Sequence, residues 1–245
     1  MGIYSKIKRA IACLLIQKKI AINLSEPIIS FTFDDVPNSA LINGEDILSK
    51  YGYQGTYYIS LGLMDKTTPN GGYCDPVYLN KIIKNGGELA CHTFNHIRLY
   101  SSSKEQILLD LEKNKKKIDE IIPGYSFSNF SYPYGEQTMT SKIIIRDKYK
   151  SARSIKSGIN SGAIDLNNLK AVMLTDDVKP EDIFAMIEKT IKSNGWLIFF
   201  THNVETPVLP YGCSPNYFET ITKYCFEKKI NVLTIEKAVN KITSK

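Results

Sequence analysis

The stretch Ile28-Ile29-Ser30-Phe31-Thr32-Phe33-Asp34-Asp35 is the part of the sequence around which the fold is built. Its apolar and β-branched residues predict a buried strand, and Pro37 helps to end it. Two carboxylates at the end of a buried strand cost free energy unless a metal ion or a moving proton uses them. Taken alone, the stretch fits equally well a loop in which Asp34 and Asp35 cap the next helix.

The composition is that of a globular protein. The chain has 245 residues, of which 43% are hydrophobic and 23% charged, and this suits one large α/β domain or two small ones. The net charge is +6, but the basic residues are spread out apart from a cluster at 113–117, which we interpret as a solvated helix face. With no nucleic-acid motif beside it, we expect no nucleic-acid partner.

The cysteines and the apolar runs bear on the compartment. Five cysteines without a C-x-x-C pair argue against a disulfide framework and favour a reducing environment. No apolar run approaches the ~20 residues of a membrane span, and the start of the chain does not read as a signal peptide. We therefore expect a cytoplasmic protein.

The first residues are predicted to form a separate element. Apolar residues of 3–24 fall on one helical face with basic residues opposite, which predicts an amphipathic helix packed on the outside of the domain. A second interpretation is a basic helix lying on a membrane surface as a peripheral contact. We divide the chain into this segment, residues 1–26, and a catalytic domain, residues 27–245.

Strands and helices are predicted to alternate along the rest of the chain. The predicted strands are 28–35, 55–64, 88–91, 127–132, 151–155, 170–175, 196–201 and 231–235. The predicted helices are 39–51, 77–85, 103–122, 138–149, 180–194, 214–229 and 236 onward, with a loop over 157–168. About seven alternations favour a mostly parallel sheet with right-handed crossovers, open or closed into a barrel.

Histidines and carboxylates gather where strands are predicted to end. His92, His96 and His202 are the three histidines of the chain, and each lies at or just past the carboxyl end of a strand. Parallel strands bring these ends to one rim, together with Asp34 and Asp35. Two imidazoles and one carboxylate can hold a divalent metal and leave positions open for water and substrate, as catalytic sites do.

The remaining groups suit hydrolysis. The second carboxylate can take a proton from the metal's water, and His202 can protonate the leaving group. Backbone N–H groups at the turn Pro133-Tyr134-Gly135 can bind the developing oxyanion. The pattern predicts metal-assisted hydrolysis of an amide or ester, without deciding which aspartate does what.

Four motifs resemble those of the polysaccharide deacetylases, the NodB-homology fold of carbohydrate esterase family 4. They are Thr32-Phe33-Asp34-Asp35, His92-Thr93-Phe94-Asn95-His96, Phe130-Ser131-Tyr132-Pro133-Tyr134-Gly135 and Ile198-Phe199-Phe200-Thr201-His202. The resemblance spans about residues 27–240 in the right order. It implies an α/β fold, a distorted (β/α)7 barrel.

The resemblance also implies roles for these residues. Asp34 would be the general base and His202 the general acid, and the Tyr134 N–H would stabilise the oxyanion. The metal ligands would be Asp35, His92 and His96, holding zinc or else cobalt or nickel.

Two departures from the family pattern stand out. Ser131 occupies a position where the family often has an arginine that orients the base, and Arg153 is a candidate replacement, although it also fits a surface arginine. Pro133 and Phe200 are further candidates for orienting substrate or base. No D-x-x-D-W motif is evident, and we interpret Asp176-Asp177 as capping the following helix.

Aromatic residues and one cysteine have more than one interpretation. Tyr57, Tyr58, Tyr73 and Tyr211 are candidates for a sugar groove, although such tyrosines also serve packing. We expect Trp196 to pack in the core or rim. Cys91 precedes His92 on a strand, so it should point away from the site.

The predicted function is removal of an N-acetyl group from an amino sugar in bacterial surface-polysaccharide or glycolipid biosynthesis. The substrate would be an N-acylated nucleotide- or lipid-linked precursor or an oligosaccharide. The alternatives are a deformylase or O-acetyl esterase on a lipid-linked sugar, or a non-catalytic carbohydrate-binding homologue. An iron oxygenase with two histidines and a carboxylate is a further, less favoured alternative.

Overall fold

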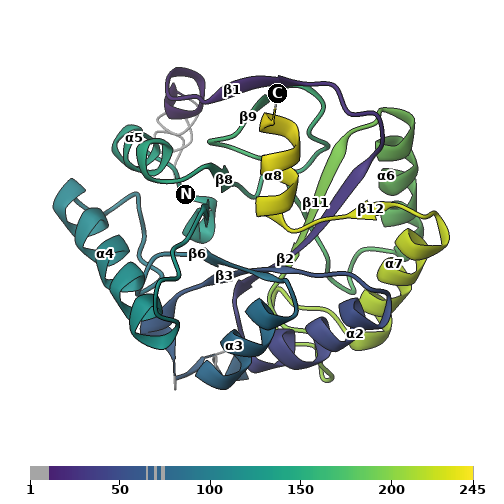
Figure 1. The fold of residues 1–245 in the computed structure, drawn as a ribbon, viewed down its shortest axis with the longest axis horizontal. Helices are drawn as coiled ribbons and strands as arrows, with labels where there is room; N and C mark the ends of the chain where they lie inside the picture. Colours follow the sequence, from purple (N-terminus) through teal and green to yellow (C-terminus); the bar gives the residue numbers. More distant parts are fainter. Residues whose placement is uncertain (1–10, 65, 69–70, 73–74, 245) are drawn as a thin grey trace.

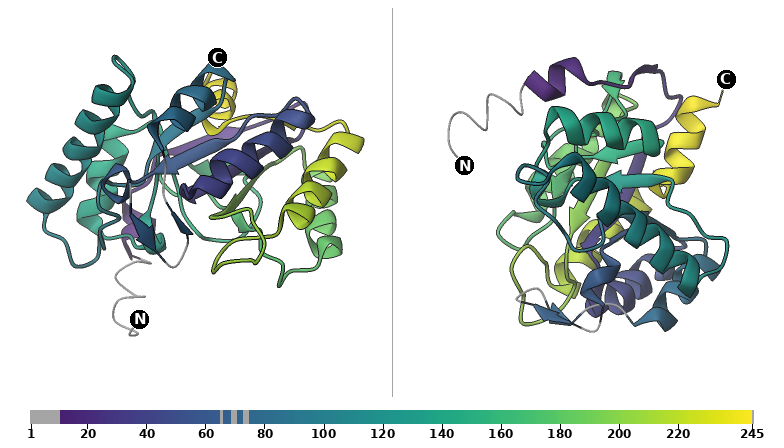
Figure 2. Two further views of the ribbon diagram at one scale, coloured as in Figure 1. Left: turned by 90° about the horizontal axis from the view of Figure 1, so that it is seen from below. Right: turned by 90° about the vertical axis from the view of Figure 1, so that its left-hand side faces the viewer.

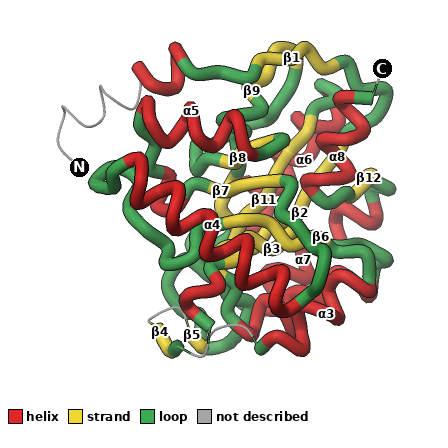
Figure 3. The backbone as a smooth tube through the Cα atoms, turned by 60° about the vertical axis from the view of Figure 1, so that its left-hand side comes forward, coloured by secondary structure: helices red, strands yellow, loops and turns green. Residues whose placement is uncertain are grey.

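A curled parallel sheet forms the centre of the protein. The structure is a computed structural model that describes residues 11–64, 66–68, 71–72 and 75–244. The strands are β1 (Lys19–Ile22), β2 (Ile28–Asp35), β3 (Thr56–Ile59), β4 (Thr67–Thr68), β5 (Gly71–Gly72), β6 (Glu88–Cys91), β7 (Asn129–Ser131), β8 (Ser151–Arg153), β9 (Gly162–Asp165), β10 (Val172–Met173), β11 (Trp196–Thr201) and β12 (Asn231–Val232). Figure 1 shows helices arranged around this sheet, and Figure 3 shows the central strands β2, β3, β7 and β11 surrounded by helices and loops, with β1, β4 and β5 at the edge of the molecule.

Most helices lie where their apolar spacing and caps predict them. They are α2 (Glu45–Lys50), α3 (Pro76–Lys84), α4 (Lys104–Ile121), α5 (Met139–Lys148), α6 (Pro180–Lys192), α7 (Pro215–Glu227) and α8 (Ile235–Thr243). A capping box begins α4, because the side-chain oxygens of Ser103 and Gln106 each accept a hydrogen bond from the other residue's backbone N–H. The described part of the chain contains no helix long and apolar enough to cross a bilayer.

The strand order brings the two ends of the sheet close together. It runs β10-β11-β2-β3-β6-β7-β8, with parallel neighbours throughout, and β12 adds to β2. Arg153 at the end of β8 forms a bridge to Leu169, and the segment that follows becomes β10. The distorted barrel predicted from the sequence is therefore confirmed. The β4–β5 hairpin projects from its body (Figure 2).

Strand alternation sorts the core into an outer and an inner layer. Phe31, Phe33 and Phe199 pack outward against the helices that surround the sheet. Ile28, Tyr58 and their inward-facing counterparts pack inside the barrel with apolar residues of α8. The inner layer also contains buried polar residues, so the barrel interior is built for more than packing.

α8 covers the amino-terminal ends of the strands. The Ile235 N–H donates to Thr56 Oγ1 at 2.9 Å, and the Glu236 N–H donates to Glu88 Oε2 at 2.8 Å. Glu88 also accepts from Asn129 Nδ2 at 2.7 Å. This buried network fills the amino end of the barrel, so the carboxyl ends of the strands remain as the rim for a site.

Several local predictions are wrong. The strand predicted over 55–64 ends at Ile59, and Leu61–Leu63 form a 3-10 helix. Residues 19–22 form β1, not helix, because they pair antiparallel with β9, which lies in the predicted loop 157–168. Helix is present at 11–15, and the rest of the prediction, residues 3–10, lies outside the described residues. Asp176 does not cap α6, whose N-cap is Lys179; its carboxylate accepts instead from the Ser214 N–H at 2.8 Å.

Candidate active site

The carboxyl end of β2 brings a carboxylate against all three histidines. Asp35 Oδ1 lies 3.3 Å from His96 Nε2 and 3.6 Å from His92 Nε2, and its Oδ2 lies 4.0 Å from His202 Nε2. Asp35, His92 and His96 each offer one donor atom, and these three atoms all lie within 4.8 Å of one another. Two imidazoles and one carboxylate at this spacing suit zinc, cobalt or nickel. The donor set therefore fits the divalent metal expected from the sequence.

A hydrogen bond to the backbone of Ser131 orients the imidazole of His92. Its Nδ1 lies 2.8 Å from the Ser131 carbonyl oxygen, which can only accept, so Nδ1 carries the proton and Nε2 presents its lone pair to Asp35. Burial lowers the pKa of His92 to about 3 and that of His96 to about 4. Both imidazoles are consequently neutral at pH 7, the form in which they can bind a metal.

Asp34 is held by Arg153. One terminal guanidinium nitrogen, Nη2, contacts both carboxylate oxygens of Asp34 and also the Ser131 hydroxyl. Burial acts to raise the pKa of Asp34, but the positive charge of Arg153 and its hydrogen bonds to the carboxylate oppose this, and the pKa of Asp34 lies below its usual value. Asp34 is therefore an ionised carboxylate beside Asp35, available to accept a proton.

The strand register explains how Arg153 reaches this place. Ser131 on β7 pairs directly with Arg153 on β8, so the two side chains enter the barrel side by side. The guanidinium packs between the rings of Tyr58 and Phe200, at 5.1 and 4.6 Å from their centres. Arg153 is completely buried, and this excludes the alternative of a surface arginine.

The backbone is left-handed at the rim. Asp34 lies an even number of residues after Ile28 on β2, so its side chain points into the barrel as that of Ile28 does. The next residue, Asp35, would point outward in a regular strand. Its φ of 61° breaks that alternation and lets Asp35 face His96. His96 and Tyr134 also have positive φ, at 51° and 56°. Such conformations cost free energy in non-glycine residues and gather at functional sites.

His202 approaches from the end of β11. Its Nδ1 lies 3.3 Å from the Tyr211 carbonyl oxygen, so that Nδ1 carries the proton and Nε2 faces Asp35. The rings of His202 and Tyr211 lie 5.5 Å apart, and the Tyr211 side chain is 59% exposed. Nε2 is therefore the atom of His202 that can exchange a proton within the site.

The third predicted motif forms a turn over His96. Pro133–Gly135 is a short 3-10 turn, and the Tyr134 ring lies 4.4 Å from that of His96. The Arg98 guanidinium carbon lies 4.3 Å from the centre of the Tyr134 ring, and Arg98 Nη1 lies 2.6 Å from Glu136 Oε1. The turn therefore sits next to the donor group, where its backbone can reach a substrate oxygen.

Sequence reasoning missed two residues of α4 that shape the site. Asp110 accepts hydrogen bonds from the N–H groups of Phe94 and Asn95, at 2.7 and 3.0 Å, and so fixes the loop between His92 and His96. Asn114 accepts from the Leu61 N–H at 3.0 Å. The available signal was a polar pair at i, i+4 on the helix face that also carries the buried Ile107, Leu111 and Ile118.

The aromatic candidates divide between the core and the rim. Tyr57 and Tyr58 are fully buried, and Tyr73 lies outside the described residues. Trp196 is buried and its Nε1 donates to Ser30 Oγ at 3.0 Å, so the expected packing role is confirmed. Cys91 packs in the outer layer, pointing away from the site as predicted.

Comparison with known proteins assigns the family. The sequence profile described as Polysaccharide deacetylase matches residues 21–151, more than half of the chain. The chain belongs to the polysaccharide deacetylase family. The match contains the motifs that carry Asp34, Asp35, His92 and His96, together with the turn at Tyr134. Membership supports a hydrolase that removes acetyl groups from an acetylated carbohydrate.

Solved structures of this family share the fold at low sequence identity. The Xyl-CE4 domain of a multidomain xylanase from the hindgut metagenome of Trinervitermes trinervoides matches with a TM-score of 0.63 and 16% identity, over 89% of this chain and 91% of that one. The family 4 acetyl xylan esterase from Clostridium thermocellum, in complex with a cobalt ion, matches with a TM-score of 0.61 and 16% identity, over 87% and 90%. The chitin deacetylase from Colletotrichum lindemuthianum matches with a TM-score of 0.60 and 16% identity, over 88% and 89%.

Proposed function

We propose that this polysaccharide deacetylase is a metal-dependent hydrolase that removes an N-acetyl group from an amino sugar of a surface polysaccharide or glycolipid. The observation that carries the proposal is the buried Asp34–Arg153 ion pair beside the donor group of Asp35, His92 and His96. An ionised carboxylate next to a metal-binding group is what an amide hydrolase needs to activate water.

Each residue has one role in the proposed reaction. Asp34 accepts a proton from the attacking water while the water oxygen bonds to the acyl carbon. Arg153 keeps the Asp34 carboxylate in position. The Tyr134 N–H donates to the acyl oxygen as negative charge develops on it. His202 Nε2 gives a proton to the amine nitrogen as the C–N bond breaks, leaving acetate and a free amino sugar. A divalent metal held by Asp35, His92 and His96 would polarise the acyl carbonyl and acidify the water.

The test is acetate release by the Asp34→Asn variant. The amide keeps the shape of the carboxylate but cannot take the proton, so we expect hydrolysis to fall by at least about a hundredfold while zinc binding persists. Asp177→Asn, at an exposed position, is the matched control and should keep full activity. Full activity in the Asp34→Asn variant would disprove the role of Asp34.

A second assay, on a panel of acylated sugars, decides which acyl group and which linkage the enzyme cleaves. The solved structures with this fold include an acetyl xylan esterase and a chitin deacetylase, whose names point to different acetylated substrates. Mass spectrometry of acyl loss from N-acetylated, O-acetylated and N-formylated sugars would separate an N-deacetylase from an esterase or deformylase. Loss of only O-acetyl or formyl groups would overturn the proposed N-deacetylation.

A further inference from the structure

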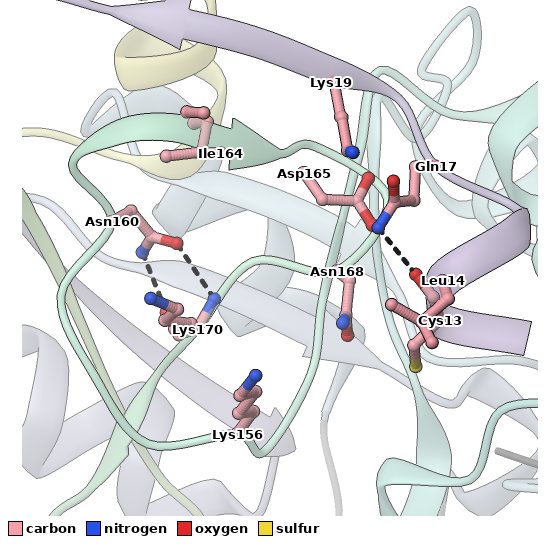
Figure 4. A pocket seen from close by; sticks show the side chains of 11 residues that line it. Cys13, Leu14, Gln17, Lys19, Lys156, Asn160, Ile164, Asp165, Asn168 and Lys170 are labelled. Carbon is pink, nitrogen blue, oxygen red and sulfur yellow. Dashed lines mark hydrogen bonds between the residues drawn. The ribbon is translucent and has the colours of Figure 1, made fainter. Parts of the chain in front are cut away.

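A second hollow lies on the side of the barrel, outside the active site. It is a cavity of about 240 Å³ between the N-terminal segment and the segment 156–170, which contains β9 (Figure 4). Lys19 reaches it from β1, and Lys156 and Lys170 reach it from the two ends of the segment 156–170. We call it the lysine cavity. No residue assigned to the active site lines it, so the proposed hydrolysis does not account for its charges.

The lysine cavity carries an excess of positive charge. Of the described residues that line it, Asp165 is the one acid, and its carboxylate is already engaged. Its Oδ1 accepts from the N–H groups of Lys18 and Asn167 at 2.8 and 2.9 Å, and the buried Lys142 Nζ lies 3.6 Å from its Oδ2. Within the described chain, no carboxylate lies within 4.0 Å of the three cavity lysine Nζ atoms. Their charges therefore remain available for an anion.

An exposed apolar face borders this cavity. Residues 11–15 are helical, and Ile11, Leu14 and Leu15 are 45%, 71% and 65% exposed. The spacing i, i+3, i+4 puts them on one side of the helix, and Leu14 also lines the lysine cavity. Large apolar side chains grouped on a basic surface are the pattern of helices that lie in a membrane interface.

We propose that this side of the protein docks on an anionic membrane surface. The apolar face enters the interface between headgroups and acyl chains, and the lysine cavity receives the phosphoryl oxygens of a lipid headgroup. Charge complementarity identifies the occupant, because three lysines with a neutralised acid attract an anion and the adjoining leucines attract hydrocarbon. The inference does not depend on which acyl group the active site removes.

The test is co-sedimentation of the full chain with vesicles. We expect binding to phosphatidylcholine vesicles that contain phosphatidylglycerol and little binding to phosphatidylcholine alone. Replacing the three cavity lysines with glutamine should weaken binding about a hundredfold, at about 1 kcal/mol for each lysine near an anionic surface. The double variant Leu14→Ser, Leu15→Ser should also weaken binding. Both variants should keep the unfolding temperature and the hydrolysis of a soluble substrate.

Matched controls separate docking from a general charge effect. Replacing Lys115, Lys116 and Lys117 of α4 with glutamine removes the same charge elsewhere, and Val77→Ser removes an apolar side chain that is 70% exposed. These controls should bind vesicles like the wild type. Equal losses in the controls, or full binding by the cavity variant, would overturn the proposal. So would binding of free inorganic pyrophosphate without binding to vesicles.

Discussion

Replacing one member of the Asp34–Arg153 ion pair should destabilise the protein far more than replacing both members. The side chains are 6% and 0% exposed, so solvent does not screen a charge left alone. Removing one member of a buried pair costs about 3–5 kcal/mol. We therefore expect Arg153→Met and Asp34→Asn each to lose stability. The methionine variant should lose more, because asparagine still offers the guanidinium an acceptor oxygen, whereas methionine offers the Asp34 carboxylate no donor.

The double variant Asp34→Asn, Arg153→Met should recover much of that loss. Neither of the two new side chains carries a charge, and a neutral replacement of a buried pair is often tolerated. The expected coupling free energy is about 2 kcal/mol or more. It is a large share of the about 5–15 kcal/mol that holds a domain folded.

Urea unfolding followed by tryptophan fluorescence measures this cycle. Trp196 is the single tryptophan and is buried inside the barrel, so its emission reports loss of the core. A chelator is included throughout, because a bound metal would add its binding free energy to the native state. Losses that add within about 0.5 kcal/mol would refute the reasoning, since additivity is the behaviour of independent sites.

Two further predictions concern metal and pH. Chelation should abolish acetate release and added zinc, cobalt or nickel should restore it; activity that survives exhaustive chelation would contradict a metal-dependent reaction. Burial raises the pKa of Glu88 from 4.5 to about 7, so the folded protein holds a proton that the unfolded chain releases. Stability should therefore fall as pH rises from about 4.5 to 7, by on the order of 3 kcal/mol, and Glu88→Gln should flatten that slope; parallel wild-type and variant curves would contradict it.

The sequence correctly predicted the elements that depend on residues close together in the chain. The apolar run of β11 and the capping residues at the start of α4 are such local patterns, and the structure contains both elements. The placing of His92, His96 and His202 on one rim followed from a general property of parallel sheets. What failed was β1, because its partner β9 lies about 140 residues further along the chain and no local pattern encodes that pairing.

The arrangement around Asp34 depends on register, which the sequence does not display. Whether Arg153 faces the site or the solvent depends on the pairing of β7 with β8, and a shift of one residue would turn it outward. Asp35 likewise turns toward His96 because its backbone is left-handed, and its residue type does not predict that conformation. Sequence patterns therefore find the residues of the site more readily than their orientations.

The register of β7 and β8 also bears on whether this chain is an enzyme or a binding homologue. Ser131 departs from the family pattern, and by itself that departure suggests a base without its arginine. In the structure, positions 131 and 153 are lateral neighbours, and the guanidinium of Arg153 contacts Asp34 from the strand beside Ser131. The small Ser131 leaves room for Arg153, and its hydroxyl accepts a bond from the same nitrogen that contacts Asp34. The guanidinium thus comes from the next strand and keeps Asp34 charged, which favours a catalytic site over a binding homologue.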